Sequence, residues 1–262
     1  MLELDAPAPV KEWAEPYDVR HPITLRQLLQ MNSGLDFAER YEANSDATRM
    51  LFMEHSAAAY AAQAGLAYPP GTHWSYSSGT SNILARIVFD QVGGTSEDLF
   101  RFVRERLFNP LGMSSMVLET DASGAPVGSS FAYATARDWA RLGQFWLRDG
   151  EWNGQRILPT GWMDFSTTPV ASAPHGEYGA QFWLNAGRDG DHHAFPGIPD
   201  SMYYAGGYNG QSVSVFPEQD IVVVRLGFTT DDSWSLGDFL RGVLAVLADY
   251  RAREPVKLAE GE

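Results

Sequence analysis

The chain divides into an N-terminal part with helical periodicity and a C-terminal part with strand-like apolar runs. A capping box, TLRQ at residues 24–27, opens the first helix, and Gly34 supplies its left-handed stop. Apolar positions at helical spacing predict further helices over residues 46–63, with a break near His55, and over 81–92, 95–109, 135–150 and 159–166. Residues 1–22 are rich in proline and acid, which predicts an extended segment.

The last third of the chain predicts a sheet followed by a helix. Strands are predicted over residues 178–184, 202–205, 212–216 and 221–226, with a hairpin turn at 217–220. The β-branched run 221–224 is typical of a strand buried on both faces. An amphipathic helix over 235–250 and a charged tail over 251–262 close the chain.

Helices, then an antiparallel sheet, then a helix predict an α+β fold. We expect an extended segment at 1–22, one domain over 23–250 and the tail at 251–262. Within the domain, the helical region runs over about residues 23–170, and the sheet and closing helix over about 175–250.

Composition excludes several classes of function. The 262 residues include 33 acidic and 19 basic side chains, a net charge of -14, which argues against a nucleic-acid or anionic-membrane partner. No cysteine is present, so disulfides and thiolate metal sites are excluded. His192 and His193 lie in a glycine-rich loop whose spacing does not suit a metal, and we expect no metal or cofactor. Residues 1–16 do not resemble a signal peptide, and the parent protein's compartment, cytoplasmic or periplasmic, stays open.

Two segments carry candidate chemistry. PPGTHWSYSSGT at residues 69–80 places Tyr76 and Ser78 between a Pro-Gly turn and a predicted helix, and GGYNGQ at 206–211 leads into a predicted strand. The only lysines are Lys11 and Lys257, and neither follows a serine by three positions, so the chain contains no Ser-x-x-Lys.

The Tyr-x-Ser triplet resembles the second motif of the penicillin-binding-protein and serine β-lactamase superfamily. Further segments are similar to those of β-lactamase-related serine hydrolases, in the same order: ITLRQLLQMNSGL at 23–35, NPLGM at 109–113, TARD at 135–138 and WNGQRILPTGW at 152–162. GGYNGQ stands where the family has Lys-Thr-Gly or His-x-Gly. The resemblance covers about residues 21–228. It implies a β-lactamase/transpeptidase-like fold and a serine that attacks an ester or amide carbonyl to form an acyl-enzyme.

The resemblance also implies roles for individual residues. Tyr76 matches the family's motif tyrosine, a base for the nucleophilic serine; its alternative is a hydrogen-bonded core tyrosine. Ser78 either orients substrate or caps the following helix. Gly210 and Gln211 match the end of the third motif, where the backbone N–H after the glycine is an oxyanion donor.

Tyr208 is the main departure from the family, which has Lys or His there. Tyrosine lacks the fixed charge that binds a substrate carboxylate, which favours an esterase or linear-amide hydrolase over a β-lactamase or carboxypeptidase. We expect Tyr208, Asn209 and Gly210 to contact a small-molecule ester or amide substrate.

In the family the nucleophile motif precedes the segment that here begins at Ile23. We therefore expect this chain to be the C-terminal majority of a serine hydrolase, inactive alone, and completed by an N-terminal fragment or a second copy. Truncation, a split gene and evolutionary loss stay open as the reason. The alternative is a non-catalytic binding or scaffold module with the same fold. A third option, an unrelated hydrolase that uses another serine, has no supporting constellation.

Overall fold

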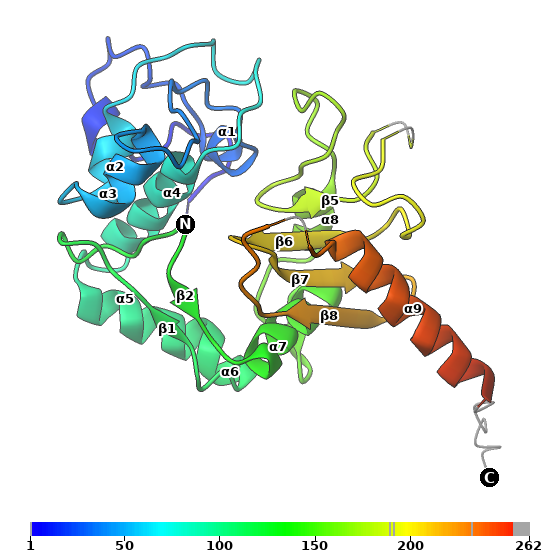
Figure 1. Cartoon of the computed structure of the whole chain (residues 1–262). Helices are drawn as coiled ribbons and strands as arrows, with labels where there is room; N and C mark the ends of the chain where they lie inside the picture. The colour runs from blue at the N-terminus through cyan, green and yellow to red at the C-terminus, as the bar shows by residue number, and fades with distance from the viewer. Residues whose placement is uncertain (1, 189, 191, 232, 254–262) are drawn as a thin grey trace.

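The computed structural model describes residues 2–188, 190, 192–231 and 233–253. Figure 1 shows a helical part, blue to green, beside a sheet in yellow to orange. The helical part contains α1 (Leu25–Leu29), α2 (Asp46–Phe52), α3 (Ala57–Ala62), α4 (Ser78–Gln91), α5 (Ser96–Val103), a π-helical turn (Arg104–Phe108) and α6 (Asn109–Leu111). α7 (Ala136–Leu147) and α8 (Trp162–Thr167) precede the sheet, and α9 (Leu236–Arg253) follows it. The predicted α+β arrangement, helices with an antiparallel sheet, is confirmed.

Side-chain caps fix where the helices begin. The capping box is present: the Thr24 side chain accepts from the Gln27 N–H, and the Gln27 side chain accepts from the Thr24 N–H. Ser56 caps α3, so the segment predicted as one interrupted helix forms two helices, α2 and α3. Ser77 caps α4 and Thr135 caps α7 in the same way.

The N-terminal segment packs into the helical core. A short 3-10 helix (Lys11–Trp13) buries Trp13, whose indole N–H donates to the Ala62 carbonyl at 2.9 Å. Val10 and Ala8 join the same apolar cluster. The sequence predicted an extended segment here, but burial of a large indole outweighs the proline-rich composition around it.

The sheet has four antiparallel strands in the order β5-β6-β7-β8. They are β5 (Trp183–Leu184), β6 (Tyr203–Gly207), β7 (Gln211–Phe216) and β8 (Ile221–Arg225). Of the predicted strand 178–184 only the last two residues join the sheet. The chain turns before them, with Gln181 in the left-handed region at φ 68° and an isolated bridge between Tyr178 and Trp183.

Helices cover both faces of the sheet. On one face Gly143 of α7 lies so close that an added Cβ would come within 2.5 Å of Val222 and 3.0 Å of Val213. On the other face Leu240 of α9 shares a buried cluster with Val223 and Phe216. The alternating sides of Val222 and Val223 explain why β8 is β-branched throughout.

β8 ends the sheet as far as the described residues extend, since it pairs with β7 alone. Two small ladders that the sequence did not predict lie outside the sheet, β1 (Val117–Leu118) with β2 (Ala132–Tyr133) and β3 (Glu151–Trp152) with β4 (Gln155–Arg156). None of the described helices combines the length and apolar character needed to cross a membrane. The predicted tail lies outside the described residues except for 251–253, which extend α9.

Candidate active site

The loop before α4 brings Tyr76 and Ser78 next to a carboxylate that the sequence did not single out. Ser78 is the first residue of α4 and is buried. Its backbone N–H donates to Glu39 Oε2 at 2.7 Å, and its hydroxyl donates to Glu39 Oε1 at 2.6 Å. The capping residue of α4 is Ser77, so Ser78 neither caps the helix nor points its hydroxyl freely into solvent. Its hydroxyl instead ties the helix start to the loop that carries Glu39.

Glu39 also holds a tyrosine. The Tyr41 hydroxyl donates to the same Oε1 at 2.9 Å, so the carboxylate accepts three hydrogen bonds. An acidic group at the start of α4 is favourable because the unpaired N–H groups of a helix N-terminus attract negative charge. Glu39 therefore fixes both the beginning of α4 and the orientation of Tyr41.

Tyr76 lies in an aromatic cluster at the boundary between the helical part and the sheet. Its ring stacks on Trp183 of β5, with centroids 5.3 Å apart, and meets Tyr178 edge-on at 6.0 Å. Burial, together with smaller electrostatic effects of Glu39 and Tyr41, raises the pKa of Tyr76 to about 12. No cation among the described residues lowers this pKa, and no hydrogen bond to the Tyr76 hydroxyl occurs within them.

The third-motif residues form the turn between β6 and β7. Asn209 and Gly210 both adopt the left-handed region, at φ 57° and 88°, and Gln211 begins β7. The guanidinium of Arg225 in β8 donates to the Gly210 carbonyl at 2.6 Å. A Cβ at Gly210 would lie 2.7 Å from that guanidinium, so the turn requires glycine at this position. Tyr208 stands at the tip of the turn, 65% exposed.

The two halves of the site meet through aromatic side chains. Tyr208 of the turn lies against Tyr41 of the helical part, with ring centroids 5.6 Å apart and planes at 46°. Trp183, which stacks on Tyr76, pairs in register with Tyr204 of β6. Tyr76 and Ser78 on one side, and the Tyr208–Gln211 segment on the other, therefore border the same junction between the helical part and the sheet.

Sequence reasoning missed Glu39, Tyr41 and Arg225. Nothing about an acid and a tyrosine in a polar loop distinguishes them from a solvated surface, and the loop's place beside α4 depends on tertiary packing. Arg225 is the last residue of β8. A charged residue is common at the edge of a sheet, so its presence there indicated no particular role.

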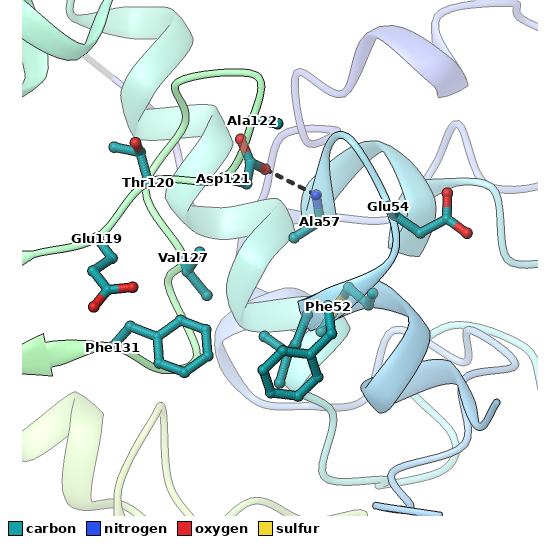
Figure 2. Close-up of a pocket in the computed structure, with 11 residues that line it drawn as sticks. Phe52, Glu54, Ala57, Glu119, Thr120, Asp121, Ala122, Val127 and Phe131 are labelled. Carbon is teal, nitrogen blue, oxygen red and sulfur yellow. Dashed lines mark hydrogen bonds between the residues drawn. The ribbon is translucent and has the colours of Figure 1, made fainter. Parts of the chain in front are cut away.

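Other features of the structure do not contribute to this junction. A hollow of about 400 Å³ lies between the α2–α3 connection and the segment 119–131, where Figure 2 shows Asp121 accepting from the Ala57 N–H at 2.9 Å. Phe52 and Phe131 both line it, with ring centroids 6.1 Å apart and planes at 59°. No predicted site residue lines it. In the described part of the chain no three His, Asp or Glu side chains converge as a metal site would need.

The family model for Beta-lactamase matches residues 2–236. The chain belongs to the Beta-lactamase family. None of the curated proteins compared with the chain matches its sequence.

Solved structures share the fold of this family member. A proposed 6-aminohexanoate-dimer hydrolase from Bacillus anthracis matches with a TM-score of 0.71 and 22% identity, over 97% of this chain and 68% of that one. An octameric penicillin-binding protein homologue from Pyrococcus abyssi matches with a TM-score of 0.67 and 18% identity, over 96% and 64%. A D-stereospecific amidohydrolase from Streptomyces sp. matches with a TM-score of 0.57 and 18% identity, over 85% and 74%. At these identities the likeness shows the fold, and the chain spans only part of each protein's length.

Proposed function

We propose that this chain provides the tyrosine and oxyanion side of a serine hydrolase site that cleaves an ester or amide through an acyl-enzyme. The nucleophilic serine and its lysine come from outside the 262 residues, which contain no Ser-x-x-Lys. By themselves these residues form no acyl-enzyme. The relatives named for amide hydrolysis in Bacillus anthracis and Streptomyces support a small amide or ester as the substrate.

The observation that carries this proposal is the convergence of two separate motifs on one junction. Tyr76 and Gln211 lie 135 positions apart in sequence, yet Tyr76 and the turn that leads into Gln211 both border the contact between Tyr41 and Tyr208. Tyr76 takes the role of proton acceptor, and the Gln211 N–H that of oxyanion donor. Arg225 holds the turn that presents Gln211.

The proposed base needs a cation that this chain does not place beside it. A phenol with a pKa of about 12 stays protonated at neutral pH and accepts a proton poorly. A lysine ammonium delivered next to Tyr76 would stabilise its phenolate and lower the pKa. The missing motif thus explains both the absent nucleophile and the unsuitable pKa of the base.

The alternative function is a non-catalytic binding or scaffold module. The observation that favours it is the tie between Ser78 and Glu39, which occupies the hydroxyl expected to orient substrate. This alternative predicts that no added segment produces turnover.

Covalent labelling tests the proposal. The chain is incubated with a fluorophosphonate or a penicillin, and the intact mass is measured. The proposal predicts no adduct on the chain alone. An adduct at any serine, abolished by substitution of that serine, would instead show that the chain has a nucleophile of its own.

A further inference from the structure

Glu39 is a carboxylate with hydrogen-bond donors but no cationic partner among the described residues. The chain pairs many of its acids with arginines, as in Glu12 with Arg86 and Asp138 with Arg141. Glu39 appears in no such pair in the part of the chain that the structure describes. Its neighbour Arg40 is exposed and forms no ion pair within the same residues. The loop 36–42 holds three acids and one base, so its charge is negative.

The hydrogen bonds of Glu39 leave one acceptor position open. An ionised carboxylate offers about four lone-pair sites on its two oxygens. Oε1 accepts from the Ser78 and Tyr41 hydroxyls, and Oε2 accepts from the Ser78 N–H alone. The remaining site on Oε2 can take one further donor, and an N–H of an ammonium group provides both the donor and the missing positive charge.

Two exposed aromatic rings lie beside this carboxylate. Tyr41 is 52% and Tyr208 65% exposed, and their rings lie 5.6 Å apart with planes at 46°. The arginines that lie over aromatic rings elsewhere occupy Phe165, Tyr60, Trp152 and Trp234, and leave Tyr41 and Tyr208 uncovered within the described residues. Two inclined rings next to a carboxylate are the surroundings that alkylammonium groups favour, through cation–π attraction and charge.

We propose that Glu39, Tyr41 and Tyr208 form a subsite for an alkylammonium group at the mouth of the acyl-transfer junction. This inference deepens the proposed function, on which it rests for the identity of the junction. The substrate is then a linear ester or amide that carries a positively charged amine. Substrates that end in a carboxylate are repelled by Glu39 and find no cation at Tyr208, where the family has Lys or His.

Binding of three ligands of equal chain length tests the subsite on the full chain. Pentylammonium, 1-pentanol and pentanoate are titrated into the ¹⁵N-labelled protein at low salt, and dissociation constants are taken from backbone amide shifts. We expect pentylammonium to bind about fivefold or more tightly than either other ligand, with shifts at Ser78 and Tyr208. Raising the salt concentration reduces this preference.

Two variants and a matched control locate the effect. Glu39→Gln keeps the size of the side chain and removes its charge, and should weaken pentylammonium binding about fivefold. Glu42 is an exposed residue of the same loop, three positions after Glu39. Glu42→Gln removes an equal charge there and should change binding by less than about twofold. Tyr208→Ala, at the exposed tip of the turn, should weaken binding about threefold and tests the subsite even if Glu39→Gln unfolds.

Several results would overturn the subsite. These are equal binding of pentanoate and pentylammonium, equal effects of Glu39→Gln and Glu42→Gln, or amide shifts confined to the hollow beside Phe52 and Phe131. Hydrolysis is not part of this measurement, so the two proposals fail separately. A chain that binds pentylammonium here yet never supports turnover keeps the subsite and loses the proposed function. A chain that supports turnover of neutral esters but does not bind pentylammonium keeps the proposed function and loses the subsite.

Discussion

The Arg225 guanidinium carbon lies 3.7 Å from the centroid of the Trp234 ring. From this position Arg225 also donates to the Gly210 carbonyl at 2.6 Å and to the Thr229 hydroxyl at 2.7 Å. One side chain of β8 therefore joins the β6–β7 turn to the segment that leads into α9. The geometry of the proposed oxyanion donor depends on this contact, because the turn ends one residue before Gln211.

Replacing Arg225 should therefore destabilise the protein. We expect Arg225→Ala to lower the free energy of unfolding by about 1–3 kcal/mol, since it removes a close cation–π contact and the hydrogen bonds to Asn209, Gly210 and Thr229. Arg148→Ala is the matched control: Arg148 lies over Trp152 at 5.8 Å, and its loss should cost below about 1 kcal/mol. Urea unfolding measures both, and equal losses would show that Arg225 does not brace the turn.

Ser78→Ala should lower stability through Glu39. The hydroxyl that is lost donates to a carboxylate at 2.6 Å, which we expect to be worth about 1–2 kcal/mol. Ser81→Ala on the same helix removes a bond to the neutral Gln181 side chain at 3.2 Å and should cost about 0.5–1 kcal/mol. In a double-mutant cycle with Glu39→Gln the effect of Ser78→Ala should shrink. Additive effects would mean that the two residues are not coupled.

Tyr76 should stay protonated well above the ordinary range of tyrosine. Its folded pKa of about 12, against an ordinary value of 10.0 for tyrosine, means that the unfolded chain loses this proton first as the pH rises. The stability that this group contributes is present below pH 10.0 and is lost as the pH rises through about 12. The ¹³Cζ shift of tyrosine, assigned with Tyr76→Phe, follows the titration directly.

Removing the charge of Glu39 should move this titration in a known direction. Burial remains in Glu39→Gln, but the nearby negative charge is gone, so the pKa of Tyr76 should fall. The carboxylate of Glu42 is not among the groups that shift the pKa of Tyr76, so Glu42→Gln serves as the control. An unchanged pKa in Glu39→Gln would mean that the carboxylate does not act on Tyr76.

The elements that sequence predicted well are those whose signals are local. The capping side chains of Thr24 and Thr135 are read from a few neighbouring residues, and each marks the start of a helix in the structure. The predicted strand 178–184 is too long because apolar side chains continue through a turn that depends on the left-handed backbone of Gln181. The junction itself required knowing that the loop of Glu39 packs beside α4, a contact between residues 39 positions apart that no local pattern encodes.

The free edge of β8 should make the isolated chain associate. Among the described residues β8 pairs with β7 alone, and Leu226 and Phe228 just beyond it are 45% and 75% exposed. Unpaired strand edges and exposed apolar side chains favour pairing with another chain. We expect light scattering to show a mass that rises with protein concentration, or poor solubility. A monomer that stays stable and soluble at every concentration would show that this edge needs no partner.

The most direct test of the account is complementation. The chain is co-expressed with an N-terminal segment of a close homologue that carries Ser-x-x-Lys, and hydrolysis of a p-nitrophenyl ester is measured together with the melting temperature. We expect no turnover from the chain alone, turnover and a higher melting temperature with the segment, and a loss of about 10²–10⁴-fold in turnover with Tyr76→Phe. A segment that binds and raises the melting temperature without producing turnover, or turnover that Tyr76→Phe leaves unchanged, would contradict the proposed role of this chain.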